Sequence, residues 1–216
     1  MSQRTNTNST TREIRFSTIE IRDLLVAWGA LGLAFTLFLQ PGFGQSLLRP
    51  GVSFSSSAFV KAFGVSLLTA GVGFLLHELA HKVTAIRFGQ LAEFRADYRM
   101  LAFAIIGALA GFLFAAPGAV YHQGMVTERE NGLIALAGPM TNVVLGILFF
   151  PLIFVGPDIV TTIGLRGAQI NFILAGFNML PWGPLDGNKV QHWSTTVFIA
   201  VLIPCVLLAL FGLFVM

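Results

Sequence analysis

The chain has 216 residues, of which 55% are hydrophobic and 11% are charged, and its mean hydropathy is +0.79. This composition excludes an ordinary water-soluble domain, because the apolar segments would be insoluble if they faced water, and it indicates an integral membrane protein. The net charge is only +3, and the basic residues lie beside apolar segments, which favours contact with lipid headgroups and argues against a nucleic-acid partner. The single cysteine, Cys205, excludes an internal disulfide.

The N-terminal part of the sequence changes from polar to apolar near residue 23. Residues 1–22 contain no apolar run and are expected to form a polar cytosolic tail, followed by a single transmembrane protease domain over residues 23–216. The first membrane segment is predicted at residues 24–39. A turn sequence, Gln40-Pro41-Gly42, follows it instead of a small-residue cleavage site, so the segment is predicted to be a retained anchor. Residues 41–57, rich in glycine and serine, are expected to form a loop.

The second apolar segment, residues 59–76, leads directly into the sequence His77-Glu78-Leu79-Ala80-His81 and is predicted to continue as one helix to about residue 88. Residues four apart lie on one helix face, so His77 and His81 can bind a single Zn²⁺. Glu78 lies roughly 100° round the helix from His77. From there its carboxylate can act as general base and acid on a zinc-bound water. Chance occurrence is the alternative, but ionisable groups at membrane depth are costly and usually functional.

A catalytic zinc usually has three protein ligands, so a third ligand must come from elsewhere. The acidic residues that follow the motif are Glu93, Asp97, Glu128, Glu130, Asp158 and Asp186. Asp186 is the preferred candidate, because it follows an apolar segment directly and lies beyond Pro181 and Pro184, which interrupt the helix and can expose an oxygen ligand at depth. The alternatives are that Asp186 only forms a turn, or that His122 or His192 is the ligand.

Three motifs occur in order along the chain. They are His77-Glu78-Leu79-Ala80-His81, Ala137-Gly138-Pro139-Met140-Thr141-Asn142, and Asn178 with Leu185-Asp186-Gly187. Together, over about residues 60–190, they resemble the site-2 protease family of intramembrane zinc metalloproteases. The resemblance implies that Asp186 is the third zinc ligand and that Asn142 binds substrate, with interhelical hydrogen bonding as the alternative for Asn142. Asn178 matches the asparagine that opens the family's NP-type motif, which implies a substrate-binding role, although Met179 stands where proline is common in that motif.

The function implied by this resemblance is that of an intramembrane zinc endopeptidase with one Zn²⁺ per chain. The implied partners are the lipid bilayer and membrane-spanning protein substrates, and the form expected is a short one without PDZ or cystathionine-synthase-like domains. A substrate helix would have to unwind before cleavage, and an open sheet edge or a polar asparagine near the zinc could hold it extended. The oligomeric state is not indicated by any pattern.

Two other functions fit parts of the sequence. A membrane transporter or channel could use the buried polar residues to line a cation path. A membrane zinc protease of another type could take a distant glutamate as its third ligand, but no glutamate follows Glu130.

The topology follows from the charges and from the zinc ligands. Basic residues in the tail predict a cytosolic N-terminus; they are Arg4, Arg12, Arg15 and Arg22. The second segment then carries His77 and His81 towards the cytosolic side. For Asp186 to reach the same zinc, the chain must cross the membrane an even number of times after His81.

Three apolar segments lie in this interval, at residues 100–121, 132–155 and 163–180, and a last one follows at residues 197–216. The first contains Gly107, Gly111, Pro117 and Gly118 and is expected to be the segment that does not cross. The predicted fold is therefore an all-α polytopic bundle of about five to six membrane segments with a re-entrant element around residues 100–121.

Overall fold

A computed structural model describes residues 14–48, 55–113 and 117–216. Most of the predicted tail, residues 1–13, therefore lies outside the described residues, as do residues 49–54 and 114–116. The elements in chain order are α1 (Thr18–Leu39), α2 (Pro41–Leu48), α3 (Ser56–Ser66), the π-helical turn η1 (Leu67–Gly71), α4 (Val72–Arg87), β1 (Leu91–Ala96), α5 (Tyr98–Leu109), β2 (Gly118–Gln123), α6 (Glu128–Phe149), α7 (Leu152–Val155), α8 (Asp158–Asn178), α9 (Asp186–Trp193) and α10 (Thr195–Phe214).

Five of the described helical stretches are long and apolar enough to cross a membrane, which confirms the predicted polytopic bundle. They are Thr18–Leu39, Ser56–Arg87, Glu128–Val155, Asp158–Asn178 and Thr195–Phe214. Large apolar side chains project outward from them, as Val144 and Ile147 of α6 and Ile203 and Leu207 of α10 do. Such an outward face suits contact with lipid, and the chain is a multi-pass membrane protein.

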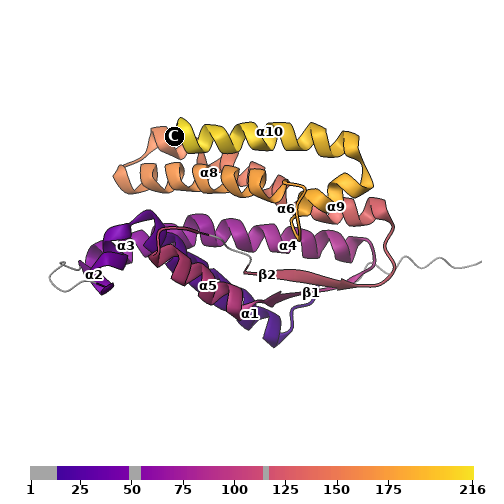
Figure 1. Cartoon of the computed structure of the whole chain (residues 1–216), viewed down its shortest axis with the longest axis horizontal. Helices are drawn as coiled ribbons and strands as arrows, with labels where there is room; N and C mark the ends of the chain where they lie inside the picture. Colours follow the sequence, from indigo (N-terminus) through magenta and orange to yellow (C-terminus); the bar gives the residue numbers. More distant parts are fainter. Residues whose placement is uncertain (1–13, 49–54, 114–116) are drawn as a thin grey trace, which may run out of the picture.

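Helix α8, the membrane segment with the most polar residues, is covered by other helices. In Figure 1 it lies with α6 beneath α10, and α4 lies below them. Its Asn171 is fully buried, and the side chain of Gln169 donates a hydrogen bond to the Gly212 carbonyl of α10 at 2.9 Å. Asn171 and Gln169, two of the polar residues that make this segment look like a poor membrane span, therefore bond to the neighbouring helices α6 and α10.

The predicted long helix through His77 and His81 is confirmed, with one irregularity. It runs from α3 through the π turn η1 into α4, and it ends at Arg87 before Gly89, which has φ of 77°. The indole of Trp28 on α1 donates to the Leu67 carbonyl at 3.0 Å, so α1 contacts the π turn. Single π turns inside α-helices are often found near functional sites.

Two ends of the predicted helices differ from the sequence-based expectation. Helix α1 begins at Thr18 inside the expected polar tail, because the Ser17 hydroxyl accepts the Glu20 amide at 3.1 Å and caps the helix. Residues 41–48, expected in a loop, form the short helix α2.

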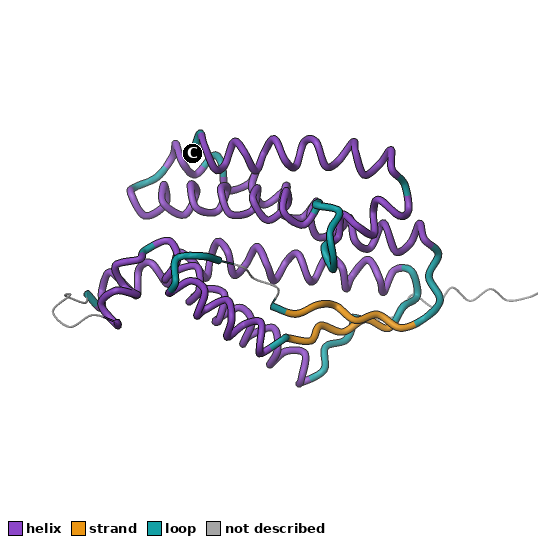
Figure 2. Tube along the Cα trace, viewed as in Figure 1, coloured by secondary structure: helices purple, strands orange, loops and turns teal. Residues whose placement is uncertain are grey.

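An antiparallel pair of strands is the part of the fold that the sequence analysis missed. No strand was expected at residues 91–96, and residues 118–121 were expected to belong to an apolar segment, yet β1 pairs with β2 from Leu91↔Gln123 to Ala96↔Gly118 (Figure 2). The amide of Asp97 donates to the Pro117 carbonyl at 2.9 Å, so the chain leaves and returns at one place. The expectation that residues 100–121 do not cross as one helix is confirmed.

We expect this topology to be visible by chemical labelling. In a Cys205→Ser background, single cysteines at Gln123 and Asn188 should be labelled by a membrane-impermeant maleimide from one face of the membrane, and a cysteine at Asp158 from the other. The reason is that α6 and α8 are the two crossings between the strands and α9. Labelling of positions 123 and 188 from opposite faces would contradict the fold.

Candidate metal centre

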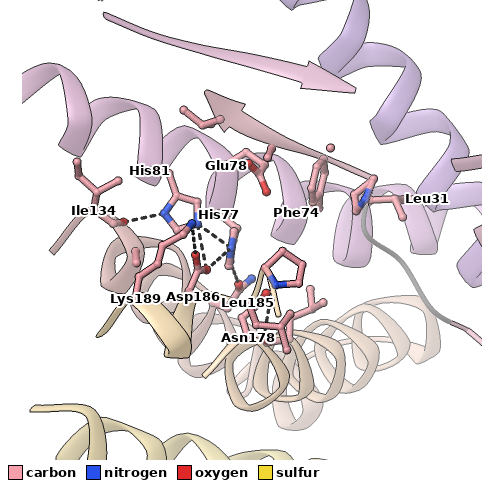
Figure 3. A pocket seen from close by; sticks show the side chains of 18 of the residues that line it. Leu31, Phe74, His77, Glu78, His81, Ile134, Asn178, Leu185, Asp186 and Lys189 are labelled. Atoms are coloured by element: carbon pink, nitrogen blue, oxygen red, sulfur yellow. Dashed lines mark hydrogen bonds and ion pairs between the residues drawn. The ribbon is translucent and has the colours of Figure 1, made fainter. Parts of the chain in front are cut away.

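Three buried side chains from two elements meet at one point of the bundle. His77 and His81 project from consecutive turns of α4, and Asp186 is the first residue of α9 (Figure 3). Their exposed fractions are 6%, 8% and 6%. The two Nε2 atoms lie 3.0 Å apart, and Oδ2 of Asp186 lies 3.2 Å from each of them. The structure thus brings together the three residues that the sequence analysis selected as metal ligands.

These distances fit a tetrahedral metal ion. With metal–ligand distances of about 2.0–2.1 Å, neighbouring ligand atoms of a tetrahedral zinc site lie about 3.3 Å apart. The three atoms of His77, His81 and Asp186 are therefore spaced as three corners of such a site, which leaves the fourth corner for water or substrate.

The second nitrogen of each ring fixes how the imidazole is oriented. Nδ1 of His77 lies 2.5 Å from Oδ1 of Asn142, and Nδ1 of His81 lies 2.7 Å from the Ile134 carbonyl. Because both partners are acceptors, each Nδ1 carries the proton, and each Nε2 presents its lone pair towards the metal position.

Asn142 connects three membrane helices. It is fully buried on α6, and its Nδ2 donates to the Gly73 carbonyl of α4 at 3.2 Å and to Oδ1 of Asn171 on α8 at 2.8 Å. With Oδ1 bound to His77, both ends of the amide are engaged within the protein. These contacts match the interhelical alternative considered for Asn142, whereas its contact with substrate stays a prediction.

Gly138 makes room for the metal position. A Cβ atom at this residue would lie 2.5 Å from Nε2 of both His77 and His81. Any larger residue on this face of α6 would therefore occupy the space of the ligand atoms. Sequence reasoning assigned no role to Gly138, although the available signal was its position four residues before Asn142, on the same helix face.

A second glycine, Gly187, lets Asp186 lie close to the end of α8. Helix α8 ends at Asn178, and the chain then turns through the segment with Pro181 and Pro184 before α9 begins. A Cβ at Gly187 would lie 2.0 Å from the Met179 carbonyl, so only glycine allows α9 to start this close to the end of α8. The proline-rich segment thus interrupts the helix as predicted.

The charge of Asp186 is favoured by its surroundings. Burial opposes ionisation, but without a metal ion a protonated His81 and hydrogen bonds from the imidazoles outweigh it and lower the pKa of the carboxyl below its usual value. With a metal ion bound, both imidazoles would be neutral and the ion would supply this positive charge. The other oxygen, Oδ1, lies 3.8 Å from Nζ of Lys189, one turn further along α9. The sequence analysis did not select Lys189, for which the only signal was its position three residues after Asp186 on a short helix.

Glu78 lines the same cavity as the three clustered residues. It is 7% exposed, and its Oε2 has no hydrogen-bond partner among the described protein atoms. A buried carboxylate oxygen without a protein partner is usually satisfied by water or a ligand. The position suits a group that acts on a water molecule beside the metal.

The remaining predicted residues divide between the cavity and the surface. Asn178 lines the cavity, and its Nδ2 donates to the Leu174 carbonyl at 3.0 Å. His122 on β2 also lines it, and burial followed by the charge of Lys189 lowers the pKa of its imidazole. His192 is exposed on α9. Neither histidine belongs to the cluster of His77, His81 and Asp186.

The cavity has a volume of about 170 Å³ and is lined by residues of α1, η1, α4, β2, α6, α8 and α9. This is enough for several water molecules, at about 30 Å³ each. Residues of β2 from Gly118 to Val120 form one wall, so a sheet edge stands opposite the buried cluster (Figure 3).

Several curated proteins are similar to this chain. "Putative zinc metalloprotease MJ0611" of Methanocaldococcus jannaschii is 41% identical over 204 residues, which are 93% of this chain and 97% of that protein. "Zinc metalloprotease MJ0392" of the same organism is 26% identical over 166 residues, 74% of this chain and 40% of that protein. "Putative zinc metalloprotease YwhC" of Bacillus subtilis is 31% identical over 144 residues, 57% of this chain and 66% of that protein.

The other two comparisons gave no match. No protein-family model matches the chain. No solved structure matches it.

Replacing Gly138 by alanine should remove the metal position. The new methyl group would lie against both Nε2 atoms, so the amount of bound metal should fall by roughly tenfold or more, as it does when a ligand loses the group that orients it. The measurement is mass spectrometry of the purified protein. Gly64→Ala, on the transmembrane stretch that carries His77 and His81 but facing open space, is the control and should keep its metal. Normal metal content in Gly138→Ala would contradict the assignment of this point as the metal position.

Replacing Asn142 by alanine should weaken metal binding by about 10- to 100-fold, because His77 would lose the acceptor that orients its ring. The measurement is competition for the metal with a chelator of known affinity. Asn178→Ala, at a residue that bonds within its own helix, should keep the wild-type affinity. Unchanged metal affinity in Asn142→Ala would show that this asparagine does not orient His77.

Proposed function

The chain belongs to the site-2 protease family of zinc metalloproteases, and we propose that it cleaves transmembrane segments of other proteins within the bilayer. The observation that carries the proposal is the buried cluster of His77, His81 and Asp186 on and beside a helix long enough to cross the membrane. Helix α4 ends at Arg87, ten residues after His77, so the site lies roughly 15 Å from that end of the helix.

One zinc ion per chain would be held by Nε2 of His77, Nε2 of His81 and Oδ2 of Asp186. The spacing of these atoms and the room left by Gly138 support this assignment. When bound, zinc supplies a Lewis acid that lowers the pKa of a water molecule to about 7. Two neutral imidazoles and one carboxylate are a ligand set that suits zinc.

Glu78 is the proposed general base and acid. Its unpartnered Oε2 takes a proton from the attacking water and later donates it to the leaving amine of the cleaved peptide bond. The burial of Glu78 and its place in the wall of the cavity support this role. Asn142 orients the ring of His77, and its contact with substrate stays a prediction.

The edge of β2 that faces away from β1 is the proposed binding surface for the unwound substrate. The amides of Phe94 and Ala96 bond to α1, so these residues and their partners Val120 and Gly118 are the non-hydrogen-bonded pairs of the ladder. The backbone groups of Val120 and Gly118 therefore point away from β1, along the edge of β2 that lines the cavity. The amide of Val120 hydrogen-bonds to Glu78 there, so a substrate strand would take the place of this side chain at the amide. An extended peptide can add to such an edge as a third strand.

We also propose that the metal centre faces the cytosolic side of the membrane. The start of α1, the end of α4, the two strands and α9 lie at one end of the bundle (Figure 1). Arg15 and Arg22, at the start of α1, and Arg87, at the end of α4, are basic residues at this end. The positive-inside rule assigns such an end to the cytosol.

The decisive variant is Glu78→Gln. We expect it to keep stoichiometric zinc and to lose proteolysis by at least about 10²-fold, because the amide cannot take the proton of the attacking water. Cleavage of a panel of single-pass membrane proteins by the purified enzyme in liposomes is the measurement, with zinc content determined in parallel.

In the wild type, chelation of the zinc should abolish cleavage, and added zinc should restore it. The His77→Ala, His81→Ala double variant should bind no zinc. Full activity of Glu78→Gln would refute the role of this residue. Zinc binding by a wild type that cleaves no substrate in the panel, but transports the ion, would favour the transporter alternative.

A further inference from the structure

The edge of β1 that faces away from β2 is covered by two carboxylates of α1. Oε1 of Glu20 accepts the amide of Phe94 at 3.0 Å, and Oδ2 of Asp23 accepts the amide of Ala96 at 3.2 Å. Glu20 and Asp23 are three residues apart and share one helix face. The two amides are two residues apart and share one strand edge. Helix α1 thus bonds to β1 in the place where another strand would.

A buried ion pair joins the same helix to α4. Nζ of Lys82 donates to Oε2 of Glu20 at 2.5 Å and to the Arg15 carbonyl at 2.6 Å. Both charged groups are almost completely buried, with exposed fractions of 1% for Lys82 and 0% for Glu20. Lys82 directly follows His81. One carboxylate therefore connects α1, β1 and the helix that carries both histidines.

Asp23 extends this connection to the start of α5. Its Oδ1 accepts the hydroxyl of Tyr98 at 2.7 Å and the guanidinium of Arg22 at 2.9 Å. The carboxylate itself is 2% exposed. The strand end at Ala96 and the first residue of α5 are thus both held by a single side chain of α1.

Stability alone does not account for this arrangement, because buried ion pairs can often be replaced by apolar pairs of similar volume without loss of stability. What the ionic arrangement provides is a fixed geometry, since each carboxylate oxygen has a directed partner on a different element. The position of β1 relative to α4 is set by these bonds, and β2 follows β1 through the ladder.

We propose that Glu20, Asp23 and Lys82 are positioning residues that place the edge of β2 lining the cavity at the correct distance from the metal centre for an extended substrate. The proposal rests on the proposed function of that edge. It assigns a specific task to α1, whose carboxylates contact neither His77, His81 nor Asp186. Loss of these bonds should impair substrate binding and leave the chemical step and the zinc intact.

The principal test is the Glu20→Met, Lys82→Met double variant. It removes both charges together, so no unpaired ion stays buried, but it leaves the Phe94 amide without its acceptor. Hydrogen exchange of residues 91–96 and 118–123 should become faster in the absence of substrate. In liposomes, KM for a single-pass substrate should rise roughly tenfold, as for loss of a charge-assisted hydrogen bond, while kcat stays within about twofold. Zinc content should be unchanged.

Two further variants keep the test decisive. Tyr98→Phe removes only the hydroxyl bound to Asp23 on a side chain that is 48% exposed, so it should fold even if the double variant does not. Its KM should rise roughly twofold, with faster exchange at the end of β1. Gln169→Leu is the matched control, because it breaks a hydrogen bond between α8 and α10, far along the chain from the strands. It should leave KM and strand exchange unchanged.

The proposal would be overturned if the double variant kept both the wild-type exchange in residues 118–123 and the wild-type KM. If the double variant does not fold, the same two results in Tyr98→Phe would overturn it. An equal rise of KM in Gln169→Leu would also overturn it, since general destabilisation would then explain the effect. If the wild type cleaved no membrane protein, the proposed function would fail, but the exchange measurement would still show whether α1 holds the strands.

Discussion

The structure depends on the requirement that polar groups inside a membrane bundle find partners within the protein. A series of side-chain hydrogen bonds from His77 through Asn142 to Asn171 meets this requirement. The bonds measure 2.5 and 2.8 Å and link α4, α6 and α8. An unsatisfied amide at this depth would be costly. The same bonds that hold three helices together therefore also fix the ring whose Nε2 faces the metal position.

Close approach of the backbone completes the centre. Gly138 leaves the space in which the two imidazole nitrogens and a metal can lie, and Gly187 lets the start of α9 pack against the end of α8. Hydrogen bonds orient the ligands, whereas these two glycines determine how near the elements come. Because protein interiors are close-packed, a single added methyl group at either position would displace a ligand.

A two-stranded sheet beside a membrane helix raises the problem of its unpaired edges. Here the outer edge of β1 bonds to Glu20 and Asp23, while the edge of β2 borders the cavity with Glu78. Of the two edges of this sheet in the described part of the chain, the edge of β2 is the one where another strand could replace a side chain, that of Glu78, at the backbone. The bonds to α1 thus explain how the outer edge of β1 is satisfied at this place, and why the edge open to a substrate faces the metal centre.

The sequence by itself determined the features that arise from local geometry. Helix periodicity puts His77 and His81 on one face, apolar length predicts the membrane helices, and prolines after α8 predict the break that precedes Asp186. The tertiary structure alone decided the pairing of β1 with β2, the bond from Asn142 to His77 and the ion pair of Glu20 with Lys82. These contacts join residues 22 or more positions apart in the strand pairs and 62 or more positions apart in the side-chain bonds, so no local period records them. They depend on how the helices pack.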